Sequence, residues 1–491
     1  MTTLEFVALI LAGVGPLLAL ARMLRLPDTL VLFGAGLGAA SAPGLPPVQV
    51  DPQLMLVLFL PPILYAATVR TSYHLLRHTL VSGVLLGVVL SLATVAAVAW
   101  AARLLLPELS WVAAFLIGSA VAVFDTRLFH EAKGRPHVPR AVADALKTRE
   151  IVGRIVVLCC FGLALDALRG QPPVLAPTLG EVAVEIGGGA LVGAALGRVM
   201  VWARERIEPA PVEIAVSIAT PYLAALAAQA LDLSVAALII AAALVISAVR
   251  IDPETGAPRT SAESRVSAMA FWEEVSLLLS AILFFLAGWT LPGAVADLTT
   301  WSAWRLSGAA AALLAVALAV QFLASLLAAV LPAPADELDA DDRRPAHRIV
   351  IAGVMSWAST RSVIGLVLAL SVPASLPDGQ PFGERYLILV VAALAVVGSI
   401  LVQGLSLRAV VRAAGLTGGH EAEREKRTAE RAMAEASPDG DDFAAVRRAL
   451  LDLRARNRVG DETLREMLRE VDLRQRTTEE SALPGAGPPN P

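Results

Sequence analysis

Charged residues and cysteines are scarce in this 491-residue sequence. Only 17% of the residues are Asp, Glu, Lys or Arg, whereas soluble domains carry about 25%, so a chain of several soluble domains is excluded. The two cysteines, Cys159 and Cys160, are adjacent and cannot join distant segments, which excludes a disulfide-based fold. The sequence also has no P-loop, dinucleotide fingerprint, metal-spaced His/Cys cluster or nucleophile elbow. We therefore expect neither a cofactor nor an enzymatic activity.

Long apolar runs take the place of the missing charge. Hydrophobic residues make up 56% of the chain, and a helix that spans a bilayer needs about 20 predominantly apolar residues. The pattern predicts an all-α polytopic membrane protein with about 13 transmembrane helices in residues 1–416, followed by a cytoplasmic helical tail in 417–491. The expected spans are 4–22, 28–42, 51–68, 79–105, 109–126, 141–167, 180–203, 211–230, 232–249, 269–291, 302–332, 348–372 and 385–414.

Basic residues cluster in alternate loops between these spans. Since cytoplasmic loops are enriched in Lys and Arg, the pattern predicts an outside N-terminus and a cytoplasmic C-terminal tail in the plasma (inner) membrane. This orientation requires an odd number of spans, and the intervening loops 41–53 and 291–303 contain no Lys or Arg. The basic loop residues are Arg22, Arg25, Arg70, Arg77, Lys133, Arg135, Arg140, Arg204, Arg206, Arg250, Arg259, Arg265, Arg343, Arg344 and Arg348.

The composition changes abruptly near Gly418. Residues 421–435 are charged and helix-prone, and apolar residues recur every three or four positions in 443–453 and 462–473, which predicts a small helical module. Asp461 is a candidate N-cap for the last helix, and we expect 484–491 to be a disordered end. Such a tail suits a regulatory role as well as a packing or assembly role.

Ionisable residues inside two apolar segments, 118–126 and 141–168, are the candidates for function. A charge near the bilayer centre costs about 2.5–3.5 kcal/mol on insertion scales, so such residues usually face the bundle interior and have partners. Asp125 lies at the end of the first segment. Glu150 and Arg154 lie four residues apart in the second, which places them on one helix face. The pattern predicts an ion site or, alternatively, a buried charge cluster that only holds helices together.

Two further features predict local geometry. Pro61 and Pro62 remove backbone donors within the third span and should break or kink it. Gly189, Gly193 and Gly197 recur every fourth position in the seventh span, a stripe that lets helices approach closely. The stripe suits a dimer face and internal packing about equally well.

Four sequence motifs occur in order along the expected spans. Residues 59–64 read FLPPIL, 271–280 read FWEEVSLLLS, 357–373 begin WASTRSVIGL, and 401–407 read LVQGLSL. With the helical tail at 452–472, they resemble the monovalent cation/proton antiporter family of the sodium/proton exchanger type. The resemblance covers nearly the whole chain, and the order and spacing of the motifs agree with it.

The resemblance implies a fold and an activity. The fold is a bundle of inverted repeats with a core domain and a dimerisation domain, in which discontinuous helices cross near the midplane and their ends face the ion site. The activity is the exchange of sodium, potassium or lithium for protons by alternating access, coupled by a carboxylate that binds either the cation or the proton. The expected partners are therefore monovalent cations, protons, the lipid bilayer and a second copy of the chain, with no nucleic acid.

The sequence departs from the family pattern at the ion site itself. Asp125 holds the position of the family's TDP aspartate, but the pattern VPRRLRTLLEGESLLNDA aligns with 138–155 so that Gly153-Arg154 replaces the Asn-Asp pair. In the same alignment Arg149 replaces the glutamate of GES, and Glu150 replaces its serine. The resemblance thus places an arginine where the principal ion-binding carboxylate is expected.

An arginine at this position inverts the local electrostatics, because its guanidinium stays protonated at any physiological pH. A cation about 4 Å from an unpaired Arg154 would be repelled by ~4 kcal/mol at an effective dielectric constant near 20. Either Asp125 pairs with Arg154 and locks the crossing, or Glu150 supplies the missing carboxylate while Arg154 is neutralised elsewhere. Arg361 then needs its own acid, for which Glu150 and Glu273 are the candidates.

Three functions remain open at this point. The leading prediction is a cation/proton antiporter with Asp125 and Glu150 as ion or proton ligands and with Arg149, Arg154, Arg361 and Glu273 as their charge partners. The first alternative is a transport-inactive family member with a scaffold or regulatory role. The second is an anion carrier with Arg154 and Arg361 as ligands.

Overall fold

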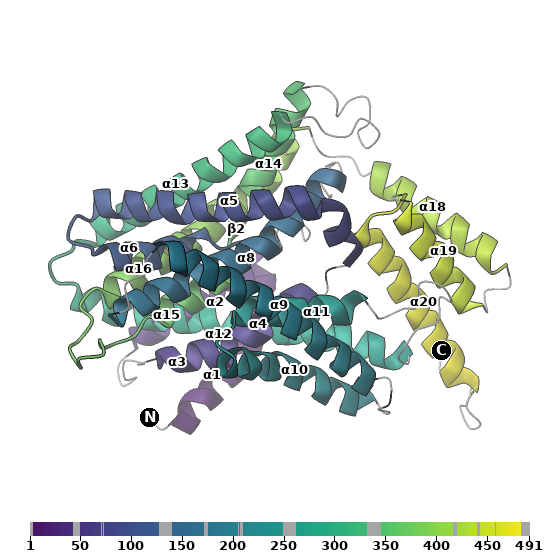
Figure 1. The fold of residues 1–491 in the computed structure, drawn as a ribbon, viewed down its shortest axis with the longest axis horizontal. Helices are drawn as coiled ribbons and strands as arrows, with labels where there is room; N and C mark the ends of the chain where they lie inside the picture. Colours follow the sequence, from purple (N-terminus) through teal and green to yellow (C-terminus); the bar gives the residue numbers. More distant parts are fainter. Residues whose placement is uncertain are drawn as a thin grey trace. The chain divides into compact units, whose positions relative to one another are not determined.

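The computed structural model of the chain is almost entirely helical where it describes the chain (Figure 1). The described residues are 3–42, 50–69, 71, 73–126, 140–170, 175–204, 206, 210–248, 262–330, 345–415, 420–438, 442–456 and 458–482. The expected disordered end at 484–491 lies outside these ranges.

Eight helices among the described residues are long and apolar enough to cross a membrane, and five further apolar helices are shorter. The protein is therefore a multi-pass membrane protein. Each predicted span coincides with one helix or one group of consecutive helices. The number of 13 crossings stays a prediction, since α2, α6, α11 and α14 do not reach spanning length by themselves. In the first half of the chain the helices are α1 (Thr3–Leu24), α2 (Asp28–Ala40), α3 (Pro52–Leu54), η1 (Met55–Phe59), α4 (Leu60–Val69), α5 (Tyr73–Leu105), α6 (Trp111–Ala122), α8 (Arg140–Leu168), α9 (Leu175–Arg204), α10 (Ala210–Ala230) and α11 (Val235–Ala248). In the second half they are α12 (Ala262–Asp297), α13 (Ala303–Val330), α14 (Pro345–Ala358), α15 (Val363–Leu370), α16 (Arg385–Ser399), η3 (Ile400–Gly404), α17 (Leu405–Ala413), α18 (His420–Ala436), α19 (Phe443–Ala455) and α20 (Asp461–Ala482).

The chain forms two compact units, each built from separate stretches of sequence. The first unit comprises Met1–Ile63, Thr79–Ile186 and Ser276–Gly418, and the second comprises Leu64–His78, Gly187–Val275 and Gly419–Pro491. The elements α6, β1, α14, β2 and α15 all belong to the first unit. The predicted boundary between a membrane domain and a tail at 416/417 stays a prediction.

One short extended segment of the first unit follows the end of α6, another separates α14 from α15, and the two segments pair with each other. After α6 the chain forms β1 (Phe124–Asp125), and β2 (Thr360–Arg361) separates α14 from α15. The two strands are antiparallel, with Phe124 opposite Arg361 and Asp125 opposite Thr360. The backbone N–H of Ser362 also donates to Val123 O at 3.0 Å. Backbone that is not helical at membrane depth is tolerated only where its polar groups find partners inside the protein, and the two breaks supply these partners to each other.

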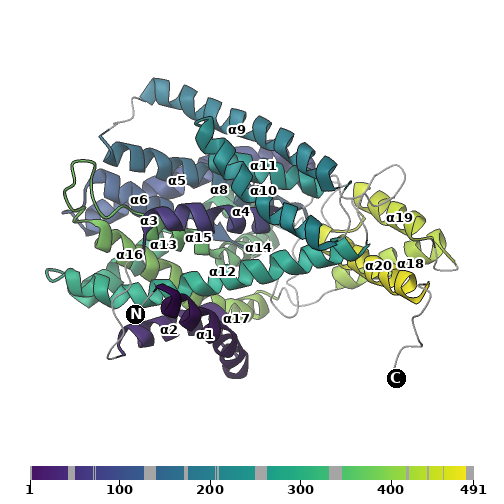
Figure 2. The same ribbon diagram turned by 90° about the horizontal axis from the view of Figure 1, so that it is seen from below.

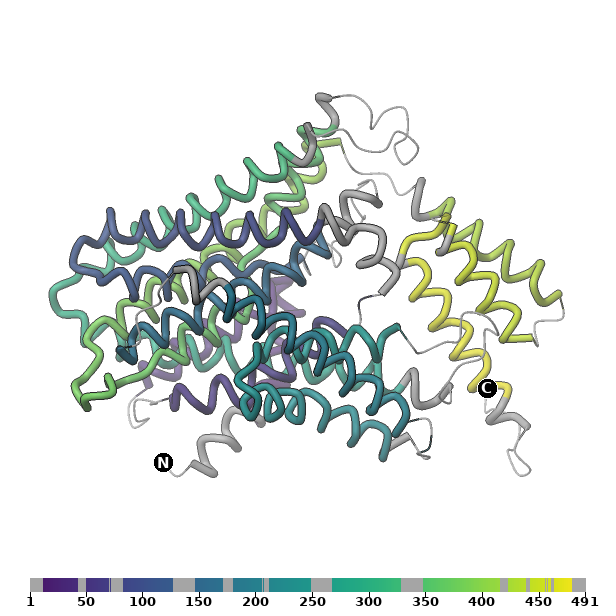
Figure 3. Tube along the Cα trace, in the orientation of Figure 1, coloured from purple at the N-terminus to yellow at the C-terminus, as the bar shows by residue number. Residues whose placement is uncertain are grey.

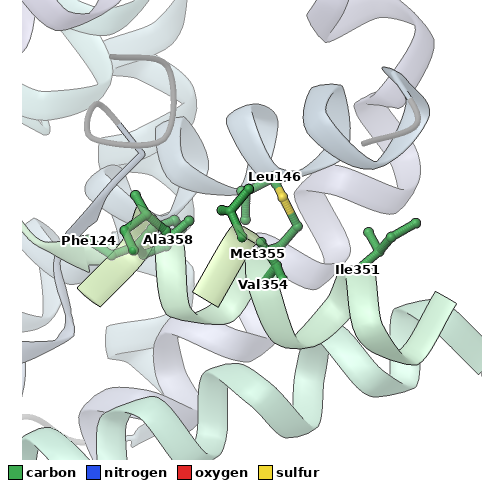
Figure 4. Packing of buried hydrophobic residues seen from close by; sticks show 8 residues of the cluster. Phe124, Leu146, Ile351, Val354, Met355 and Ala358 are labelled. Atoms are coloured by element: carbon green, nitrogen blue, oxygen red, sulfur yellow. The ribbon is translucent and has the colours of Figure 1, made fainter. Parts of the chain in front are cut away.

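An apolar cluster holds β1 in place. Phe124 of β1 packs with Leu146 of α8 and with a row of α14 side chains, among them Met355 and Ala358 (Figure 4). Leu407 and Val411 of α17 complete the same cluster. Because α8 also carries the charged residues of the candidate site, this cluster fixes the charged part of α8 beside the strand crossing.

The helix around Pro61 and Pro62 is continuous, which corrects the expected break. The segment η1 is a π-helix that joins α3 directly to α4. Prolines cannot donate to the carbonyl groups one turn earlier, and the wider π-turn before them accommodates this loss without ending the helix. The distortion expected from the sequence is therefore present as a π-helical segment.

The glycine stripe of α9 packs inside the second unit, where α9, α10 and α11 run close together in Figure 2. A Cβ atom at Gly189 would lie 3.0 Å from Ser234 O, and one at Gly197 would lie 2.8 Å from Ala242 O. At Gly193 it would collide with Leu238 O. The stripe therefore serves contact between α9 and α11 and not a dimer face, and the homodimer itself stays a prediction.

The last three helices, α18 to α20, form a bundle with its own core (Figure 3). The buried guanidinium of Arg447 donates to Asp472 Oδ1 at 2.8 Å. Helix α20 begins at Asp461, and Glu425 of α18 accepts hydrogen bonds at its start, from Gly460 N at 2.9 Å and from Thr463 Oγ1 at 2.8 Å. The core residues are Ala429, Val446, Leu450, Val459, Leu464, Met467 and Val471.

Candidate ion site

Glu150 is the most enclosed carboxylate of the candidate site. Its side chain is fully buried and forms an ion pair with Arg154, one turn later on α8. Lys147, one turn earlier, donates to the same carboxylate at 3.1 and 3.2 Å. Thr126, directly after β1, donates its hydroxyl to Glu150 Oε2 at 2.6 Å. The helical spacing thus places one positively charged side chain on each side of Glu150. Thr126 links α8 to the strand crossing.

Asp125 is the more accessible of the two acids. Its carboxylate lies 3.7 Å from Arg154 Nη2, and its side chain is 18% exposed, compared with 2% for Arg154. Arg154 therefore bridges the two acids: it pairs closely with Glu150 and more loosely with Asp125. Arg154 thus contacts both acids that the sequence suggested as its partners, Asp125 and Glu150.

Arg361 lies on β2 and is held by backbone carbonyl groups. Its guanidinium donates to Val121 O and to Ser359 O, both at 3.1 Å, and its backbone N–H donates to Ser399 Oγ at 2.9 Å. No carboxylate among the described residues of the first unit lies within ion-pair distance of it, so its expected pairing with Glu150 is not observed there, and a pairing with Glu273 of the second unit stays a prediction. The physical reason for the missing pair with Glu150 is that the carbonyl groups left open by the broken helix ends are strong acceptors in their own right.

Arg149 also lies beside β1. Its guanidinium lies over the ring of Phe124, 4.8 Å from the ring centroid. Arg154, on the same helix, lies beside the next strand residue, Asp125. Arg149 is thus a further buried cation beside β1.

Glu273 is exposed on α12 and belongs to the second unit. Its neighbour Trp272 is the buried member of the motif, where the indole N–H donates to Ser217 Oγ at 2.8 Å and the ring packs against Tyr65 at a centroid distance of 4.7 Å. This part of the FWEEV motif therefore has a packing role in the second unit.

Gln403 is a site residue that sequence reasoning missed. Its side-chain amide donates to Trp357 O at 2.7 Å, where α14 ends, and its carbonyl oxygen accepts from the hydroxyl of Ser399. Gln403 lies in the π-helix η3, which places these groups against β2. The motif LVQGLSL contained the signal, because a glutamine inside an apolar span needs polar partners.

Comparison with known proteins agrees with this architecture. The model of the family described as "Sodium/hydrogen exchanger, transmembrane" matches residues 7–413. The chain is 30% identical over 391 residues to an uncharacterized Na+/H+ exchanger of Mycobacterium tuberculosis, covering 79% of this chain and 69% of that protein. It is 26% identical over 415 residues to the Na+/H+ antiporter NhaP of Pseudomonas aeruginosa, covering 80% and 92%.

A solved structure shares the fold. The sodium proton antiporter MjNhaP1 of Methanocaldococcus jannaschii, determined at pH 8, superimposes with a TM-score of 0.60 at 13% sequence identity, covering 83% of this chain and 97% of that one. The match of the family model extends from α1 to α17 and includes both broken helices. The chain therefore belongs to the sodium/hydrogen exchanger family and is a secondary transporter, not an enzyme.

Proposed function

We propose that the protein exchanges sodium or potassium for protons by alternating access, with Asp125 as the carboxylate that binds either the cation or the proton. The observation that carries this proposal is the difference between the two acids. The side chain of Glu150 is fully buried, whereas that of Asp125 is 18% exposed, so a cation or a proton reaches Asp125 more readily. In this proposal α6 to β1 and α14 to β2 are the crossing helices of two inverted repeats within 13 spans.

Arg154 has the role of a fixed internal cation in this mechanism. Its close pair with Glu150 keeps the guanidinium on α8 when a sodium or potassium ion approaches Asp125. Repulsion between that ion and Arg154 is ~4 kcal/mol at about 4 Å and an effective dielectric constant near 20, so the cation binds on the side of Asp125 that faces away from Arg154. Because one carboxylate carries one charge, the proposal implies one cation per proton.

The test is a flux assay in proteoliposomes with imposed pH and sodium or potassium gradients. Asp125→Asn should abolish cation-dependent proton flux while the protein remains folded by thermal unfolding in detergent. Asp166→Asn is the matched control, because Asp166 is an exposed acid on the same helix, paired with Arg169. A folded Asp125→Asn protein with unchanged flux would refute the proposed role.

A second candidate is a transport-inactive member of the family. The observation that favours it is the bridge of Arg154 between Asp125 and Glu150, which ties β1 to α8 with a cation that cannot leave. The same assay decides: wild-type protein that moves neither cation at any pH gradient supports this candidate. An anion carrier that uses Arg154 is not favoured, because two carboxylates lie beside its Nη2 atom and would repel an anion there.

We also propose an outside N-terminus and a cytoplasmic tail in the plasma (inner) membrane. The alternation of basic loops supports this orientation. In a background where Cys159 and Cys160 are replaced by alanine, a cysteine at exposed Asp378 should react with an impermeant reagent in intact cells. A cysteine at exposed Asp452, on α19, should react only after lysis, and labelling of it in intact cells contradicts the orientation.

A further inference from the structure

Two buried arginines beside the strand crossing have donor groups without an acceptor among the described residues. Arg149 is 6% exposed and Arg361 is 2% exposed. Nε and Nη2 of Arg149 and Nε of Arg361 have no hydrogen-bond partner in the structure. Buried polar groups are nearly always satisfied, and buried guanidinium groups in particular need acceptors. These donors therefore point to a ligand that the described part of the chain does not supply.

The pairing of β1 with β2 brings the two arginines together. Phe124 lies directly opposite Arg361 in the register, and opposite residues of paired strands project on the same face. Arg149 covers the ring of that same Phe124 at 4.8 Å. Two guanidinium groups from β2 and α8 thus share the neighbourhood of one aromatic ring.

The charges of the described side chains do not balance at this position. Four positive side chains lie around the crossing with two carboxylates, and both carboxylates lie beside Arg154. Water can satisfy an N–H group, but it leaves the described side chains at the crossing with a surplus of positive charge, and unpaired buried charge is costly. The positive side chains are Lys147, Arg149, Arg154 and Arg361, and the carboxylates are Asp125 and Glu150.

We propose that a small monovalent anion of chloride size binds between Arg149 and Arg361 and remains there as a static ligand. The site offers only N–H donors and positive charge, so the ligand is an acceptor that carries negative charge. The carbonyl groups of Val121 and Ser359 already accept hydrogen bonds from Arg361 and partly compensate its charge. A ligand with one negative charge is therefore enough to compensate the two guanidinium groups. The anion is a fixed counter-charge beside the crossing, and it is not the transported ion.

The test is anion binding to the purified, detergent-solubilised protein without ion gradients. Radiolabelled chloride should bind saturably and be displaced by unlabelled chloride. The thermal unfolding temperature should rise with sodium chloride but not with sodium gluconate at equal sodium concentration and ionic strength. Arg149→Gln should weaken chloride binding about tenfold or more, since hydrogen bonds to charged groups are worth about 1.5–3 kcal/mol.

Arg103→Gln is the matched control, because Arg103 also contacts an aromatic ring, 5.4 Å from the centroid of Trp111, and donates to Pro107 O. This variant should keep the full chloride response. If Arg149→Gln does not fold, Arg149→Lys serves instead, since it keeps the charge but loses the paired N–H groups, and it should bind chloride more weakly than the wild type. Absence of saturable chloride binding in the wild type, or an equal response in the Arg149 variants, overturns the proposal. Because no transport is measured, this result is independent of the proposed antiport.

Discussion

Replacing Arg154 by glutamine tests which acid is its main partner. Arg154 and Glu150 are both fully buried and in direct contact, whereas Asp125 is 18% exposed and lies 3.7 Å away. Removing one member of a buried ion pair typically costs ~3–5 kcal/mol, because the remaining charge loses its compensation. Glu150 retains Lys147 and the hydroxyl of Thr126, so we expect a loss near the lower end, about 3 kcal/mol.

The double variants separate the two partners. Arg154→Gln with Glu150→Gln removes the uncompensated buried charge and should recover about 2 kcal/mol, within the range of the penalty for an unsatisfied buried group. Arg154→Gln with Asp125→Asn should recover less than about 1 kcal/mol, because a partly exposed carboxylate is solvated by water once its partner is gone.

The measurement is chemical unfolding of the detergent-solubilised protein, with each single variant measured alongside the doubles. Asp166→Asn provides the control, since this exposed acid is distant in sequence on α8 and its effect should add to that of Arg154→Gln within about 0.5 kcal/mol. Equal recovery by the two doubles, or a larger recovery with Asp125→Asn, would refute the assignment of Glu150 as the main partner.

Two further substitutions test packing. A Cβ atom at position 153 would lie 2.7 Å from Ser91 Oγ. The double variant Gly153→Asn with Arg154→Asp, which restores the family's pair, should therefore be about 1–3 kcal/mol less stable than the triple variant that also carries Ser91→Ala. Equal unfolding temperatures of the double and triple variants would contradict this reasoning. In α9, Gly193→Ala should lower the unfolding temperature, because its Cβ collides with Leu238 O, whereas Gly187→Ala, with no atom within 4 Å, should be neutral or stabilising. A similar decrease in both variants would show that the α9–α11 contact is not the cause.

The sequence alone determined the class of the protein and the position of its helices. Apolar runs of membrane length identify spanning segments because a lipid environment tolerates little else. The i, i+4 spacing of Glu150 and Arg154 also determined their pairing, since a continuous helix fixes which side chains share a face. The family motifs then identified the transporter family, which the comparisons confirm.

Contacts between segments distant in sequence were decided only by the tertiary structure. The pairing of β1 with β2 joins residues more than two hundred positions apart, and it gives Arg361 carbonyl acceptors in place of the expected Glu150. The same pairing gathers Arg149 and Arg361 around Phe124. From the sequence, the glycine stripe of α9 suited a dimer face and internal packing equally well, and only the structure shows the backbone of α11 packed against it. Local spacing specifies neighbours within one helix, but the partner of a side chain on another segment depends on how the backbone breaks and crosses, which no single stretch of sequence encodes.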